Sequence, residues 1–262
     1  MKQYPDDLIR GFDRALRTLT GQHQASRPSP ATNLPGSTVT ETGSSATNDE
    51  VRVEVEINEE AVALAQQADR APEEPVSAGL TPDEKRHAAG LMRVNHCGEV
   101  CAQALYDGQS VTARSPEVLA VLAQAGAEEI DHLVWCEQRL DELDARPSVL
   151  NPLFYAASWT LGAVAGLLGD RVSLAFVEAT EDQVVKHLDS HLESLPAGDD
   201  RSRAVVAQMR ADEARHGDEA LELAQSLGSA GEDAAADQRL SPVQKRVMAG
   251  VARLMTATTY RI

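Results

Sequence analysis

A pattern of glutamate and histidine residues occurs twice in this chain of 262 residues, once in each half. In each copy a single Glu is followed by a Glu-x-x-His, after 30 residues in the first copy (99 to 129) and 32 in the second (181 to 213). The members are Glu99, Glu129 and His132 in the first copy, and Glu181, Glu213 and His216 in the second.

This spacing suits a metal centre. Glu and His at positions i and i+3 lie on one face of a helix and can bind the same ion. A Glu about 30 residues earlier can face them from an antiparallel helix. Two such hairpins supply four carboxylates and two imidazoles, which is the ligand set of di-iron and di-manganese bundles. A single Glu-x-x-His arises often by chance on solvated helices, but two copies at nearly equal spacing predict a site.

Other polar residues near the pattern allow two interpretations. Glu128, Asp212 and Arg215 flank the Glu-x-x-His motifs, where they could orient the imidazoles or simply be exposed charges. His187 and His191 have a spacing that can bind metal, but His187 lies more than one helical turn after Glu181. We expect a supporting or exposed role for this pair. His96, one turn before Glu99, can also support the site.

Composition favours an all-α protein and excludes some functions. Hydrophobic residues make up 42% of the chain and aromatic residues 3%. The formal net charge of -17 argues against nucleic-acid binding, which requires a basic face. The three cysteines, at positions 97, 101 and 136, include no Cys-x-x-Cys and predict no disulfide framework.

Helix signals divide the chain into three parts. Residues 1–20 predict an amphipathic N-terminal helix, which either packs on the bundle or contacts a membrane surface. Residues 21–75 form a low-complexity insert that we expect to be disordered. Residues 76–262 contain the predicted four-helix domain. Its helices are expected from Pro82 to about Ala113, from Pro116 to about Leu143, from about Arg171 to Ser194, and from about Asp199 to Leu227, with a last helix after Pro242.

Between the two hairpins, residues 149–169 carry no charged side chain. Their number is near the roughly 20 residues that span a bilayer. A crossing, however, would place the two copies of the motif on opposite sides of the membrane. We therefore predict an apolar crossover helix of a ferritin-like bundle. One side of it either meets lipid or a lipidic ligand, or is buried against the bundle.

Several stretches resemble one enzyme family over nearly all of the chain except about residues 21 to 75. They are LMRVNHCGEVCAQALYDGQSVTAR around Glu99, IRGFDRALRTL, EEIDHLVWC, FVEATEDQVVKHLDSHL, DEARHG and the closing YRI. These motifs are similar to those of demethoxyubiquinol hydroxylase, a ferritin-like di-iron monooxygenase. The family's six ligand positions are filled here by the six residues of the repeated pattern.

The resemblance implies a function. It implies two iron ions, a polyprenyl quinol substrate, molecular oxygen, and peripheral attachment to the cytoplasmic face of the cell membrane, with other ubiquinone-biosynthesis proteins as further candidate partners. Two features depart from the family: the low-complexity insert, and Leu188, where eukaryotic members have a Tyr. Two alternatives share the fold: an iron-storage or ferroxidase protein, and a non-catalytic, membrane-associated scaffold stabilised by metal.

Overall fold

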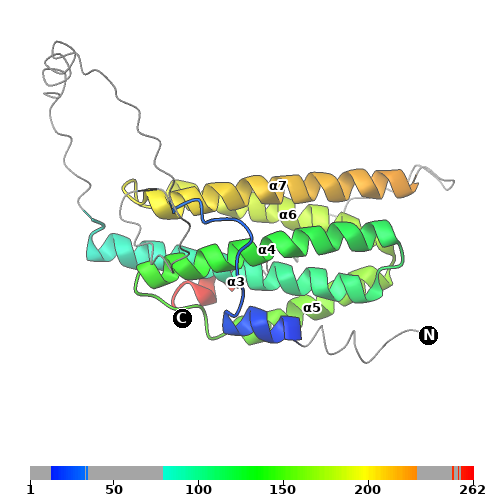
Figure 1. Ribbon diagram of the computed structural model, residues 1–262, viewed down its shortest axis with the longest axis horizontal. Coiled ribbons are helices and arrows are strands. Elements are labelled where there is room, and N and C mark those ends of the chain that lie inside the picture. Colours follow the sequence, from blue (N-terminus) through cyan, green and yellow to red (C-terminus); the bar gives the residue numbers. More distant parts are fainter. Residues whose placement is uncertain (1–12, 33, 35–78, 229–249, 251–252, 254) are drawn as a thin grey trace, which may run out of the picture.

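The computed structural model describes residues 13–32, 34, 79–228, 250, 253 and 255–262. Four long helices of this part pack side by side, and a shorter one crosses between the second and the third (Figure 1). The helices are α3 (Pro82–Thr112), α4 (Pro116–Glu142), α5 (Asn151–Leu167), α6 (Asp170–Ser194) and α7 (Asp200–Gly228). Within the described residues there is no strand. The predicted all-α bundle with its crossover helix is confirmed.

The first two bundle helices begin where their capping residues predict. The hydroxyl of Thr81 accepts a hydrogen bond from the backbone N–H of Glu84, and the Glu84 carboxylate accepts one from the backbone N–H of Thr81 at 2.9 Å. Ser115 caps α4 in the same way through the N–H groups of Glu117 and Val118. These side chains satisfy donors that the first helical turn leaves unpaired.

Two apolar clusters occupy opposite ends of the bundle. One contains Met92 and Trp135, and the other contains Leu122 and Val177. On each long helix, the residues of the repeated Glu and His pattern lie between the residues of these two clusters. The polar centre is therefore enclosed at mid-length of the bundle by packed side chains.

Helix α5 packs closely against α3 because glycines remove the side chains at the contact. A Cβ atom added at Gly108 would lie 2.1 Å from the carbonyl oxygen of Trp159, and one added at Gly162 would lie 2.2 Å from that of Leu105. The other side of α5 is apolar and open, with Leu153 66% exposed. Among the described residues, none of the helices combines the length and hydropathy needed to cross a membrane.

The described N-terminal residues lie against the bundle. Residues 13–20 are helical, and residues 21–32 cross the front of α4 towards α7 (Figure 1). The predicted disordered insert begins at residue 21, so the structure differs from that expectation for residues 21–32. The reason is that Ser26 and Arg27 bond Asp131, and Ala31 is buried in a core cluster.

Residues 1–12 and 35–75, and the start of the predicted last helix, fall outside the described part of the chain.

Candidate metal centre

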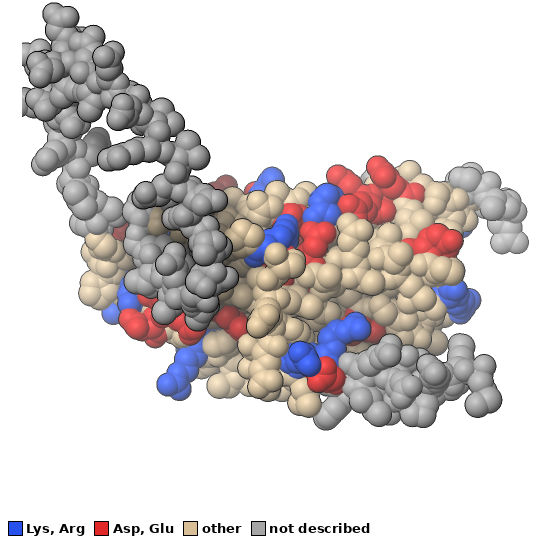
Figure 2. All heavy atoms as spheres, viewed as in Figure 1, with Lys and Arg blue, Asp and Glu red and all other residues tan. Residues whose placement is uncertain are grey.

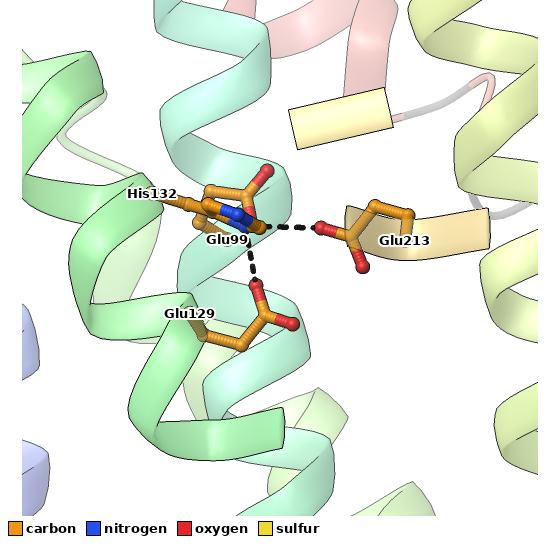
Figure 3. A group of neighbouring side chains, drawn as sticks. All are labelled: Glu99, Glu129, His132 and Glu213. Carbon is orange, nitrogen blue, oxygen red and sulfur yellow. Dashed lines mark hydrogen bonds and ion pairs between the residues drawn. The ribbon is translucent and has the colours of Figure 1, made fainter. Parts of the chain in front are cut away.

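Four acidic and imidazole side chains from three helices meet at one point. They are Glu99 from α3, Glu129 and His132 from α4, and Glu213 from α7. One ligand atom of each lies within 4.8 Å of those of the others, and the side chains point towards one another between the helices (Figure 3). All four residues are at most 3% exposed.

The ring of His132 turns one nitrogen towards the carboxylates. Its Nδ1 lies 3.1 Å from Glu213 Oε1, 3.2 Å from Glu129 Oε2 and 3.5 Å from Glu99 Oε2. The i, i+3 pairing expected of Glu129 and His132 is present. Both side chains of the first Glu-x-x-His therefore face the same point, as the sequence predicts.

The second Glu-x-x-His mirrors the first. The Nδ1 atom of His216 lies 3.2 Å from Glu213 Oε2 and 3.4 Å from Glu129 Oε1. Glu129 and Glu213 thus each contact both imidazoles. The two helices that carry the motifs, α4 and α7, present them to each other across the bundle axis.

Two predicted ligands, His216 and Glu181, lie outside the group of four, and Glu181 is held by a residue of α3. It is 2% exposed, and its Oε1 accepts a hydrogen bond of 2.6 Å from the hydroxyl of Tyr106. Burial and then the charges of Glu213 and Glu129 raise its pKa well above the usual range. Its side chain therefore borders the same acidic centre while a tyrosine holds one of its oxygens.

The outer nitrogens of both imidazoles face carboxylates. His132 Nε2 lies 3.0 Å from Asp212 Oδ2, and His216 Nε2 lies 3.4 Å from Glu128 Oε2. Arg215 contacts both of these carboxylates. The orienting role considered for these three flanking residues agrees with these contacts, although Arg215 touches the carboxylates and not the rings. Such contacts fix the orientation of a metal-binding imidazole.

The remaining histidines lie elsewhere. His191 Nδ1 is 2.7 Å from Asn95 Oδ1, and its ring contacts that of His187 with 4.0 Å between centroids. His96 is paired with Glu137 and Asn151. None of the three belongs to the group of four, and His96 and His191 each join α3 to another helix.

The buried negative charge of the centre favours the binding of cations. Burial raises the pKa of Glu99 well above the usual range, whereas contacts with the two imidazoles outweigh burial and lower the pKa of Glu129. Glu181 Oε2 has no hydrogen-bond donor, and Glu213 Oε1 and Glu129 Oε1 have only an imidazole nitrogen at 3.1 and 3.4 Å. Buried carboxylate charges that are only partly compensated destabilise the fold. Four carboxylates would balance two divalent ions, so the donor set fits a carboxylate-rich pair of metals.

Three residues around the centre carry no sequence signal of their own. Tyr106 holds Glu181, Asp131 lies beside His132 in α4, and Arg27 reaches Asp131 and Asp212 from the N-terminal segment. A tyrosine on a helix is normally an ordinary core residue. The low-complexity sequence around Arg27 predicts no packing at all, so its position follows only from tertiary contacts.

Comparisons with known proteins agree with this geometry. A family model described as ubiquinone biosynthesis protein COQ7 matches residues 86–259. The 3-demethoxyubiquinol 3-hydroxylase of Ralstonia pickettii is 46% identical over 258 residues, which is 98% of this chain and 99% of that protein. The enzyme of the same name from Ectopseudomonas mendocina is 56% identical over 183 residues, 70% of this chain and 80% of that protein.

Proposed function

This chain belongs to the family of the ubiquinone biosynthesis protein COQ7, and on that premise we propose that it is a 3-demethoxyubiquinol 3-hydroxylase. The observation that carries the proposal is the buried meeting of the two Glu-x-x-His motifs, where Glu129 and Glu213 each contact both imidazoles. The reaction inserts one atom of O₂ into a ring C–H bond of the quinol. The other atom becomes water with two electrons and two protons from a donor.

The six residues of the repeated pattern would hold two iron ions. With iron bound, these residues would form the site at which electrons from the donor reach oxygen, which is the chemistry that ring hydroxylation requires. The protein contributes the carboxylates that balance the charge of the metal ions, and the closed bundle that keeps water away from them. Tyr106 keeps Glu181 in place, and Asp212 and Glu128 keep the imidazoles turned inwards.

The quinol substrate carries a polyprenyl tail and has to be taken from a membrane. The open apolar side of α5 supports docking there, since Leu153, Leu161 and Leu167 are 66%, 49% and 63% exposed. Apolar surfaces of this kind mark contact sites. Between α3 and α6, Leu105 and Phe176 pack beside Tyr106 and Glu181 and leave no space that a water molecule could enter, so a ring would reach the centre there only if these side chains move. Such docking would make the attachment peripheral, and the cytoplasmic face is what the family resemblance implies.

The function can be tested in cells that lack their own hydroxylase. Expression of the full chain is expected to convert accumulated demethoxyubiquinone into downstream quinones, measured by mass spectrometry. Glu181→Ala is expected to abolish both conversion and iron loading. Asp182→Ala, which changes the neighbouring exposed carboxylate of α6, is the matched control and is expected to convert normally.

Unchanged demethoxyubiquinone in cells that contain the folded, iron-loaded wild-type chain would contradict the proposal. It would favour the ferroxidase or the scaffold, because both bind metal without acting on the quinol. Full conversion by Glu181→Ala would instead contradict the role of the centre.

A further inference from the structure

One arginine near the centre comes from outside the long helices and outside residues 86–259 of the family match. Arg27 donates from Nε to Asp131 Oδ2 at 2.7 Å and from Nη1 to Asp212 Oδ2 at 2.9 Å. In Figure 2, basic and acidic side chains lie side by side on this face, between α4 and α7. One guanidinium thus joins two acidic residues that stand next to ligands on two different helices.

The position of Arg27 is fixed by several other contacts. The backbone N–H of Ser26 donates to Asp131 Oδ1 at 2.6 Å, and Trp135 Nε1 donates to the carbonyl oxygen of Arg27 at 3.2 Å. The guanidinium also lies over the Trp135 ring, 4.9 Å from its centroid. Four residues further on, Ala31 is buried. Arg27 is therefore held from both sides of its backbone and cannot be treated as a freely moving surface residue.

The contact with Asp212 connects Arg27 to the centre. Asp212 Oδ2 lies 2.9 Å from Arg27 Nη1 and 3.0 Å from His132 Nε2, so one oxygen serves both groups. The other oxygen accepts from Gln208 and Arg215 at 3.2 and 3.3 Å. The carboxylate is only 7% exposed. Its placement and its effective charge at His132 thus depend on the cations around it.

We propose that Arg27 is a positioning residue of the iron centre: it fixes where Asp212 stands beside His132 and offsets the charge of that carboxylate, and this offset keeps the reduction potential of the iron high. This inference rests on the proposed function. Without the guanidinium, Asp212 withdraws the Nε2 proton of His132 more strongly, which makes the imidazole a better electron donor and stabilises the oxidised metal. Loss of the positive charge of Arg27 near the iron also stabilises the oxidised metal and lowers its reduction potential.

The test is spectroelectrochemistry of the iron-loaded full chain. Arg27→Gln is expected to raise the ratio of oxidised to reduced iron about tenfold at a fixed potential, a shift of about 59 mV for a one-electron couple. Arg27→Lys is expected to shift it less in the same direction, because one ammonium cannot bind both carboxylates as the planar guanidinium does. Arg17→Gln, which removes an exposed arginine of the same N-terminal segment, is the control and should not change the ratio.

Four results decide the inference. A wild-type ratio in folded Arg27→Gln would overturn it and leave the hydroxylase intact. A folded Arg27→Gln that loses iron retained by Arg27→Lys would support it, because the holding role is then visible in metal binding. If Arg27→Gln does not fold, a wild-type ratio in Arg27→Lys would overturn the inference. A wild-type chain that binds no iron would overturn both this inference and the proposed function.

Discussion

The two hairpins of the bundle contribute the same residue types but hold them differently. In the hairpin of α3 and α4, Glu99, Glu129 and His132 all belong to the group of four. In the hairpin of α6 and α7, only Glu213 belongs to it, while Glu181 is held by Tyr106. The outer nitrogen of His132 is 3.0 Å from its carboxylate, and that of His216 is 3.4 Å from a more exposed one. The first hairpin is therefore preorganised more tightly, although the sequence pattern is symmetrical.

The largest effect is expected where the two halves meet. Glu129 lies 3.2 Å from His132 and 3.4 Å from His216, so Glu129→Ala removes a carboxylate that serves both imidazoles. We expect loss of both irons and of all hydroxylation, measured by iron content and quinone analysis. Asp141→Ala, an exposed carboxylate near the end of the same helix, should retain both. Retention of one iron by Glu129→Ala would show that the halves bind independently.

The carboxylates behind the imidazoles allow a direct comparison of the halves. Asp212→Asn is expected to weaken Fe(II) binding by about 10- to 100-fold, the usual cost of losing such a partner. Glu128→Gln should weaken it less, because this carboxylate is 19% exposed and more distant from its imidazole. Anaerobic competition with a chelator measures both variants. Equal losses would mean that the two imidazoles are equally well supported.

The Tyr106→Phe variant tests how the hairpin of α6 and α7 keeps Glu181 in place. Tyr106→Phe leaves Glu181 buried without its donor, which is expected to lower the unfolding free energy of the metal-free chain by about 1–3 kcal/mol. Urea unfolding measures this change. Leu133→Val, which shortens another buried core side chain, is the control for loss of packing. Its loss of unfolding free energy should be the same with and without metal, whereas that of Tyr106→Phe should change when metal is bound. An undiminished unfolding free energy in Tyr106→Phe would show that Glu181 needs no donor.

A smaller effect concerns the link between the hairpins at His191, which pairs with Asn95. Burial, followed by the charges of His187 and His87, lowers its pKa to about 3. The unfolded chain therefore takes up a proton that the folded chain excludes as pH falls from about 6.5 towards 3. The contribution of His191 to the unfolding free energy is therefore fully present above this pH window and is lost as the pH falls through it. At pH 5.5 the loss is about 1.4 kcal/mol.

His191→Gln keeps a donor for Asn95 but cannot titrate. Its loss of unfolding free energy between pH 7.5 and 5.5 is expected to be smaller than that of the wild type by the same amount of about 1.4 kcal/mol. Urea unfolding at the two pH values measures it. Equal pH dependence in the two chains would show that His191 is not kept neutral by the fold.

Local signals explain why most of the fold could be predicted. The capping box at Thr81 and the Ser115-Pro116 pair act within one helical turn, so the sequence contains all that is needed to place α3 and α4. The inward face of Glu129 follows from helical spacing. The support by Tyr106 and Arg27 could not be predicted, because each acts through a residue 75 or more positions away, as the pairs Tyr106–Glu181 and Arg27–Asp131 demonstrate.

The central claim is that the two unequal hairpins form one centre for two irons. The most direct measurement is an anaerobic Fe(II) titration of the full chain, with bound iron counted per chain at saturation. The account predicts two irons per chain in the wild type, and fewer than two in both Glu99→Ala and Glu213→Ala, which remove one carboxylate from each hairpin. Saturation of the wild type at one iron, or binding that is unchanged in either variant, would contradict it.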